Sequence, residues 1–222
     1  MSEENKAKSL TTLMEESEVY HPSPEIVKRA KVSDPEQVRN RANEDYKAFW
    51  EGVAKELEWY EPWNTVLDDS DSPFFQWFVG GKTNIVLNAL ERHLRTERAE
   101  KLALIWEGEP GDKRQVTYRE LNDEVCKFAN ALKKMGIKRG HRVMTYMPNM
   151  VEHAVALLAL AKIGAVHSVV YAGFSAQALV DRIDDAQAVA VICSDGLYRR
   201  GKIINLKATV DEAVERTPSV KM

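Results

Sequence analysis

The chain has 222 residues, is 44% hydrophobic, and carries 31 lysines and arginines against 34 aspartates and glutamates. A net charge of −3 excludes a broad basic surface, so we expect no nucleic-acid partner. The longest apolar run, residues 154–161, is far shorter than the roughly 18 residues that cross a bilayer, so we expect no membrane segment. The N-terminus lacks the basic-then-apolar order of a signal peptide, and Cys126 and Cys193 have no redox or metal-binding spacing. We therefore predict a cytoplasmic protein.

The first hundred residues predict an extension rather than a domain of their own. We expect residues 1–20 to be disordered or loosely held, and residues 21–100 to form an arm that wraps around the body. Pro24 and Pro35 stand where prolines open helices, and the second helix carries an apolar stripe from Val38 to Leu57. An amphipathic helix is expected over residues 84–94.

Four aromatic residues follow one another closely in this arm, namely Phe74, Phe75, Trp77 and Phe78. Such a cluster could form a binding platform. The simpler interpretation is that these side chains anchor the arm onto the body, because exposed aromatic surface is costly in water.

Residues 101–222 alternate between strand and helix patterns. The pattern predicts a hairpin from strands 102–106 and 115–117, then a helix that a Thr117–Glu120 capping box opens and Gly136 ends. Strands are expected over 142–147, 166–170 and 188–192, with helices that Asn149 and Ser175 cap between them. A polar turn over 194–202, a helix over 203–216 and a strand beginning at 219 complete the series.

Strand–helix–strand order predicts an α/β fold. We expect a partial doubly wound, mostly parallel sheet with helices on both faces, preceded by the helical and aromatic N-terminal arm. Residues 166–170 are too apolar to have a wet face, which favours a central position for that strand.

The sequence does not match the common phosphate-loop, dinucleotide-binding or metal-binding motifs. Gly81-Lys82-Thr83 has Gln76 where a phosphate loop requires glycine, and no strand is followed by GxGxxG. The five histidines have no metal-binding spacing, and His167 is expected to be a hydrogen-bonded core residue. Asp181, Asp184 and Asp185 are expected on a solvated helix face. The sequence therefore assigns no catalytic residue and no metal ligand.

Two turns carry the strongest functional signal. Tyr198-Arg199-Arg200-Gly201-Lys202 follows a strand at the edge where open α/β sheets bind ligands, and arginine can hold a phosphate with two hydrogen bonds. Tyr171-Ala172-Gly173 ends another strand on the same edge, where its glycine lets a ligand approach the backbone. A solvated basic loop is the alternative.

These segments carry a resemblance to a known family. Residues 116–121, 146–148, 161–175 and 198–202 resemble the AMP-forming acetyl-CoA synthetases (acetate–CoA ligases) of the acyl-adenylate-forming superfamily. Phe49-Trp50, Trp59 and residues 88–94 are similar to that family's N-terminal region.

The resemblance implies a two-step reaction, in which acetate and ATP give acetyl-adenylate and CoA then takes the acetyl group. It also implies that Arg199, Arg200, Gly201 and Lys202, with Tyr171, Ala172 and Gly173, bind CoA. Lys202 stands where arginine is common in the family, which keeps the charge and loses the forked geometry. Mg²⁺ is implied by the family, with no ligand in this segment.

The family's phosphate loop, carboxylate pocket and catalytic lysine have no counterpart in these 222 residues. We therefore expect the N-terminal portion of such a ligase, whether a fragment, a truncated frame or a split subunit, with residues 101–222 as the first part of the AMP-binding domain. Its expected partners are acetate, ATP, CoA and the remainder of the synthetase chain, and alone it is expected to be inactive. The alternatives are a propionyl-CoA synthetase fragment, a non-catalytic half-domain that binds CoA or a partner, and a structural remnant.

Overall fold

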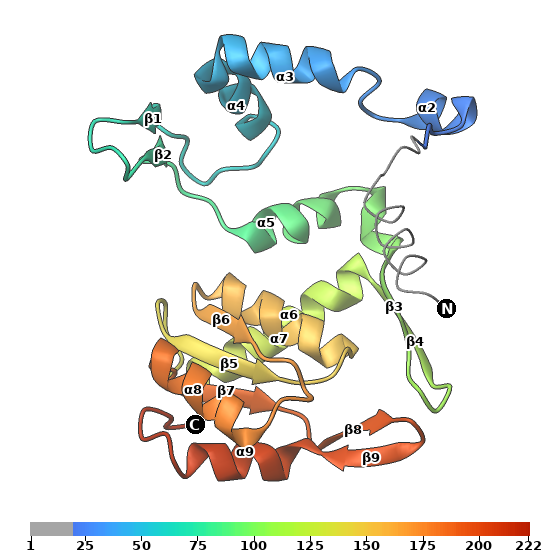
Figure 1. The fold of residues 1–222 in the computed structure, drawn as a ribbon, viewed down its shortest axis with the longest axis vertical. Coiled ribbons are helices and arrows are strands. Elements are labelled where there is room, and N and C mark those ends of the chain that lie inside the picture. The colour runs from blue at the N-terminus through green and yellow to red at the C-terminus, as the bar shows by residue number, and fades with distance from the viewer. Residues whose placement is uncertain (1–19) are drawn as a thin grey trace, which may run out of the picture. The chain divides into compact units, whose positions relative to one another are not determined.

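The computed structural model describes residues 20–222, and they belong to two compact units, residues 20–54 and residues 55–222 (Figure 1). The prediction for residues 1–20 lies, apart from Tyr20, outside the described residues. Residues 55–100, assigned to the arm from the sequence, belong to the same compact unit as residues 101–222. The wrapping of the arm around the body stays a prediction.

The first unit contains the helices α2 (Pro24–Arg29), α3 (Pro35–Glu44) and α4 (Tyr46–Ala54). Proline occupies the first turn of α2 and of α3, as predicted. The expectation of one continuous stripe to Leu57 was wrong, because the helix breaks at Asp45. The Asp45 carboxylate accepts a hydrogen bond from the Ala48 N–H at 2.9 Å, which favours a new helix start over continuation of α3.

The second unit begins with the antiparallel strands β1 (Thr65–Asp68) and β2 (Gln76–Val79), followed by α5 (Ile85–Ala89). The helix predicted over 84–94 is shorter, because Leu90 leaves helical geometry and the short 3₁₀ helices η1 (Glu91–Arg95) and η2 (Glu97–Glu100) follow. The Asn84 amide donates to the carbonyl of Ala161 at 3.0 Å, which ties the start of α5 to a helix far along the chain.

The four aromatics at 74–78 do not act as one anchor. Phe78 packs against Trp59 and Trp63, with ring centroids 5.6 and 5.2 Å apart. Phe74 and Phe75, by contrast, are 74% and 53% exposed. Phe78 therefore belongs to an aromatic cluster within residues 55–100, and its anchoring onto the body stays a prediction, whereas the exposure of Phe74 and Phe75 shows that the prediction was wrong for these two residues.

The hairpin and the long helix that follow confirm the sequence prediction. Strands β3 (Leu102–Glu107) and β4 (Lys113–Thr117) pair antiparallel, and α6 spans Tyr118–Lys134. Thr117 and Glu120 form a complete capping box, and Gly136 ends the helix with φ +95°.

A three-stranded parallel sheet lies at the centre of this unit. Its order is β6 (Val166–Val169), β5 (Arg142–Tyr146), β7 (Ala190–Cys193). The helices α7 (Val151–Lys162), α8 (Ala176–Ala186) and α9 (Leu206–Val214) connect or follow these strands.

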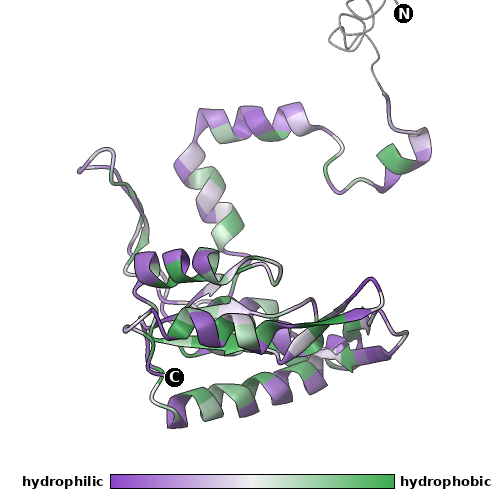
Figure 2. Ribbon diagram, turned by 60° about the horizontal axis from the view of Figure 1, so that its bottom comes forward, coloured by the Kyte–Doolittle hydropathy of each residue, from purple (hydrophilic) through white to green (hydrophobic). Residues whose placement is uncertain are grey.

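Helices cover both faces of the sheet (Figure 1). Val143 points toward the cluster that α6 and α7 build, whereas Met144 and Tyr146 point toward the cluster that α8 and α9 build. In Figure 2 the strands of this sheet are largely hydrophobic, while the helices show alternating hydrophobic and hydrophilic bands. The predicted α/β class, with a parallel sheet and helices on both faces, is confirmed.

The predicted central strand was wrong. β5 lies in the middle, and β6 is an edge of the sheet within the described chain, with Val166 and Val169 about half exposed. His167 is accordingly exposed rather than a core residue. An apolar run indicates that a strand's faces are covered, but the crossover connections decide its rank in the sheet.

Three further details differ at the ends of elements. Met150, not Asn149, is the N-cap of α7. Helix α9 begins only at Leu206, and residues 219–222 form no regular strand, although Lys221 N–H donates to Val189 O and Val191 N–H to Met222 O.

Asp181, Asp184 and Asp185 are exposed on α8, as predicted. Among residues 20–222, no helix combines the length and the apolarity that crossing a bilayer requires.

The capping box of α6 provides a test of this local interpretation. Replacing Thr117 with Ala removes the acceptor for the Glu120 N–H, so the free energy of unfolding should fall by about 1 kcal/mol. Urea titration followed by circular dichroism measures this change. Thr117→Ser keeps the hydroxyl and should cost clearly less, and equal losses in the two variants would contradict the capping explanation.

Candidate functional site

The predicted polar turn over 194–202 is a β-hairpin. Strands β8 (Gly196–Arg199) and β9 (Lys202–Asn205) pair antiparallel, with Arg199 opposite Lys202. Arg200 and Gly201 form the connection, with φ of +54° and +71°. Two consecutive left-handed residues are the geometry of a two-residue hairpin turn, which glycine favours and arginine tolerates at a cost.

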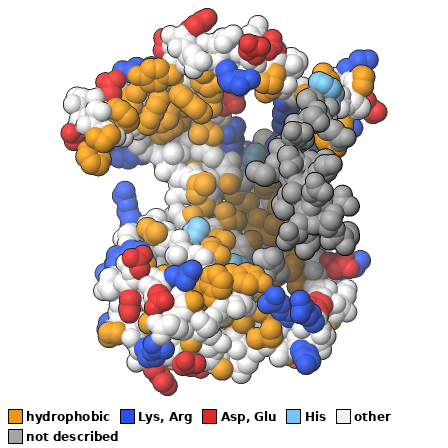
Figure 3. Space-filling model, viewed as in Figure 1, with side chains coloured by type: hydrophobic (Ala, Val, Ile, Leu, Met, Phe, Trp, Pro, Cys, Tyr) orange, Lys and Arg blue, Asp and Glu red, His pale blue; other side chains and the backbone are white. Residues whose placement is uncertain are grey.

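The hairpin concentrates three cations at its tip. Arg199, Arg200 and Lys202 are all exposed, and no carboxylate within the described chain forms an ion pair with any of them. Figure 3 shows Lys and Arg side chains gathered over the end of this hairpin, beside a patch of apolar side chains. Unpaired exposed cations of this kind can bind an anion without first breaking an internal ion pair.

The turn after β6 lies beside this tip. A Cβ atom placed on Gly173 would lie 3.2 Å from Nη1 of Arg199 and 2.6 Å from Cε1 of Tyr171. The two turns singled out in the sequence are therefore neighbours, and a side chain at position 173 would crowd the guanidinium. Ala172 is buried in the core, so only its backbone can face a ligand.

A buried tyrosine holds this turn in place. The Tyr146 hydroxyl at the end of β5 donates a 2.7 Å hydrogen bond to the carbonyl of Phe174. Burial raises the pKa of Tyr146, so the group stays a neutral donor. The Phe174 ring in turn packs edge-on against Tyr171 and lies under the Arg182 guanidinium at 4.8 Å.

An acidic residue from a distant hairpin reaches the same site. The Gly201 N–H donates a 2.6 Å hydrogen bond to Oε1 of Glu109, which lies in the turn between β3 and β4. A cavity of about 370 Å³ separates this turn from β8, and Trp106, Pro148 and Tyr198 are among the residues that line it. Sequence reasoning missed Glu109, because 92 positions separate it from Gly201 and no local pattern links them.

The topology explains why these turns meet. Because β5 and β6 run parallel, the loop to α7 and the turn to α8 leave the same carboxyl edge, but they lead to opposite faces of the sheet. Open α/β sheets bind their ligands in the crevice that such a divergence creates. The turn after β6 and the hairpin after β7 thus both lie at the carboxyl edge of the parallel sheet.

A second residue missed from the sequence is His153, which is buried in α7. Its Nε2 lies 3.0 Å from Thr145 Oγ1, and its Nδ1 lies 3.2 Å from the carbonyl of Pro148. Since a carbonyl only accepts, Nδ1 carries the proton and Nε2 accepts from the threonine hydroxyl. Burial, opposed by the Pro148 hydrogen bond and assisted by His167, lowers the pKa of His153. This histidine therefore fixes the loop between β5 and α7.

The described residues contain no group of three or more His, Cys, Asp or Glu side chains that could hold a metal ion. Both cysteines are unpaired, with Cys126 in α6 and Cys193 in β7.

Comparisons with known proteins agree with this architecture. A family model described as AMP-binding enzyme matches residues 90–221, and one described as acetyl-coenzyme A synthetase N-terminus matches residues 36–89. The acetyl-coenzyme A synthetase of Mycolicibacterium smegmatis is 56% identical over 81% of this chain and 19% of its own length. That of Rhodopirellula baltica is 46% identical over 98% of this chain and 34% of its own.

A solved structure gives the same result for the fold. The acetoacetyl-CoA synthetase from Streptomyces lividans superposes with a TM-score of 0.75 at 31% identity, over 80% of this chain and 28% of that one. The chain thus spans between a fifth and a third of the length of the relatives it matches.

The first model covers more than half of the chain, and the chain belongs to the family of AMP-binding enzymes. Within that family it corresponds to the N-terminal part of an acetyl-coenzyme A synthetase.

The buried His153 predicts a pH dependence of stability. The pKa of His153 is lower in the folded chain than in the unfolded chain. Below about pH 6.5 the unfolded chain therefore binds more protons than the folded chain, and the free energy of unfolding falls as the pH falls. His153→Asn keeps a donor toward Pro148 and should reduce this fall, measured by urea titration between about pH 7.5 and pH 5.5. His93, whose pKa burial also lowers, should leave a residual slope.

The exposed His21 supplies the control, since His21→Asn also removes one histidine. An unchanged slope in His153→Asn would contradict the assignment.

Proposed function

We propose that this chain is the N-terminal portion of an AMP-forming acetate–CoA ligase, and that its two neighbouring turns hold the phosphates of CoA. The observation that carries the second claim is the approach of Arg199 to Gly173, which forms one cationic rim from two turns. The family assignment supports the first claim.

The reaction sets what these residues have to do. Acetate and ATP form acetyl-adenylate and pyrophosphate, and the CoA thiol then takes the acetyl group while AMP leaves. CoA carries its negative charge at the nucleotide end, far from the thiol. A cationic rim can bind that end without taking part in the chemistry, so Arg199, Arg200 and Lys202 are proposed as binding residues and no catalytic residue is proposed in this chain.

The geometry suits a phosphate group. The arginines can donate paired hydrogen bonds, and the absence of a side chain at Gly173 leaves space beside the guanidinium of Arg199. Hydrogen bonds to charged groups contribute about 1.5–3 kcal/mol each, with the lower end expected at an exposed rim. The exposed Tyr171 and Tyr198 rings offer apolar surface next to the charge.

The other substrates are proposed for the whole enzyme rather than for these residues. Acetate is favoured as the acyl substrate because the acetyl-coenzyme A synthetase relatives are 43–56% identical, against 31% for the acetoacetyl-CoA synthetase structure. ATP, and the remainder of the synthetase chain as its partner, follow from the same family membership. Mg²⁺ is implied by the family, but residues 20–222 contain no group of side chains that could hold it. A reducing compartment, the cytoplasm, is proposed from the two unpaired cysteines.

The decisive test uses the full-length enzyme, because its two half-reactions can be measured apart. Arg199→Ala should raise the KM for CoA about tenfold, the loss expected for one charge-assisted contact. It should leave acetate-dependent exchange between ATP and pyrophosphate unchanged, because that step precedes CoA binding. Lys207→Ala removes a nearby cation that is already paired with Asp211, and should leave both activities unchanged.

Two outcomes would contradict the proposal in different ways. If the unmodified full-length enzyme does not catalyse acetate-dependent exchange between ATP and pyrophosphate, the ligase assignment is wrong. An unchanged KM for CoA in Arg199→Ala, with exchange intact, would remove the CoA site and leave the ligase assignment in place. The 222-residue chain alone is expected to catalyse neither step.

Glu109 provides an independent prediction. Its carboxylate occupies the Gly201 N–H, so an incoming phosphate has to displace it. Glu109→Gln removes the competing charge and should lower the KM for CoA severalfold, whereas Glu107→Gln, in the same cavity wall, should change it less. Steady-state kinetics of the full-length enzyme measures both, and a raised KM in Glu109→Gln would show that the acid supports rather than competes with the ligand.

A further inference from the structure

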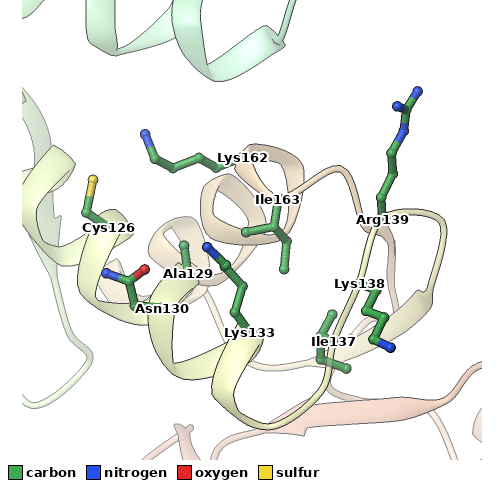
Figure 4. Close-up of a pocket in the computed structure, with 9 residues that line it drawn as sticks. All are labelled: Cys126, Ala129, Asn130, Lys133, Ile137, Lys138, Arg139, Lys162 and Ile163. Atoms are coloured by element: carbon green, nitrogen blue, oxygen red, sulfur yellow. The ribbon is translucent and has the colours of Figure 1, made fainter.

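A group of cations outside the candidate site surrounds a cavity of about 550 Å³ between the ends of α6 and α7 (Figure 4). Four cationic side chains line it, contributed by Lys133, Lys138, Arg139 and Lys162. No carboxylate lines it, and Ala129 and Ile137 form a buried apolar floor. This concentration of positive charge is unexpected in a chain with a net charge of −3.

The cavity lies at the opposite end of the sheet from the CoA site proposed above. Lys138 and Arg139 precede β5, and Lys162 and Ile163 precede β6, whereas Tyr171 to Gly173 follow β6. The Gly140 N–H donates to the Gly164 carbonyl at 2.9 Å, which joins the two loops at this amino edge. The two cationic regions are therefore separate.

The local charges leave a positive excess. Glu91 forms an ion pair with Lys162 and neutralises one cation. The C-terminal ends of α6 and α7 each contribute about half a negative charge, which offsets one more. About two positive charges thus stay uncompensated around the cavity as a whole, and Lys133 is the cation without an ion-pair partner in the described chain at the end where α6 and α7 lie side by side.

The side chains are arranged to receive such a group at one end of the cavity. Lys133 and Lys162 extend from adjacent helices into the same space, next to Cys126 and Asn130, whereas Lys138 and Arg139 lie on the loop at the other end (Figure 4). Lys133 and the Asn130 amide have no hydrogen-bond or ion-pair partner among residues 20–222. Burial disfavours the charge on Lys162, but Glu91 and Cys126 outweigh it and raise the pKa of Lys162, so this lysine stays protonated.

We infer that the cavity between α6 and α7 is a second anion site, which binds a small phosphorylated anion through Lys133, Lys162 and the Asn130 amide. The apolar floor admits a nucleoside as well as an inorganic phosphate, and the two sources share the phosphate group that the cations recognise.

Cys126 reports occupancy of this cavity directly. It lines the cavity and is unpaired, whereas Cys193 lines a separate apolar cavity beside β7. The purified chain is treated with iodoacetamide, a neutral reagent, and the alkylation rates of the two cysteines are compared by peptide mass spectrometry. Inorganic pyrophosphate should slow alkylation of Cys126 at least threefold relative to Cys193, and NaCl at equal ionic strength should not.

Matched variants locate the binding residues. Lys133→Gln should raise the half-protecting pyrophosphate concentration at least fivefold, because it removes one of the two ammonium groups at the ligand end. Lys134→Gln makes the same charge change in the same helical turn, but Lys134 does not line the cavity, so it should change the value less than twofold. Because Lys133 is exposed, its replacement should not disturb folding, and circular dichroism checks this for both variants. Asn130→Asp is a second test: it adds a negative charge beside the ligand and should also weaken protection.

Each contrary result overturns the inference. Protection by NaCl alone would reduce the effect to ionic screening, and equal losses in Lys133→Gln and Lys134→Gln would show a diffuse field rather than a site. Loss of protection in the Arg199→Ala, Arg200→Ala double variant would place the anion at the hairpin instead. Comparison of pyrophosphate with ADP distinguishes the sources, since stronger protection by ADP at equal charge identifies a nucleotide.

Discussion

The alternation of side chains along β5 is the constraint on which the rest of the larger unit depends. Val143 contributes to the core under α6 and α7, while Met144 and Tyr146 contribute to the core under α8 and α9. Because successive residues of a strand point to opposite faces, this one strand joins two hydrophobic cores. Its backbone pairs with β6 on one side and β7 on the other, so the turns that follow all three strands are placed by the same element.

Tyr146, at the end of β5, links the core to the cationic rim that Gly173 and Arg199 form. Its ring lies in the core, and its hydroxyl donates a hydrogen bond to the Phe174 carbonyl. This hydrogen bond ties the turn that carries Gly173 to the core. The cationic hairpin approaches from β7, and the β3–β4 turn approaches from outside the parallel sheet. The positions of the exposed side chains at this rim thus depend on core packing several residues away, as is usual for loops on a rigid scaffold.

The sequence predicted this architecture well where local chemistry decides the structure. The capping box at Thr117, the proline starts of α2 and α3, and the parallel sheet with helices on both faces all follow from short-range patterns. The rank of β6 was missed because strand order is a property of the crossovers. Likewise, the contact of Glu109 with Gly201 and the burial of His153 depend on distant segments meeting, and neither residue has a neighbour in sequence that marks it.

The carboxylate of Glu109 has a consequence for the energetics of the cationic hairpin. A phosphate that takes its place replaces the Glu109 carboxylate at the Gly201 N–H. The hairpin tip is thus already close to one anion before the ligand binds. Part of the Coulomb attraction already exists in the free protein, so only the difference between phosphate and carboxylate contributes to affinity. Binding at this rim is therefore expected to respond to ionic strength less steeply than its number of arginines and lysines suggests.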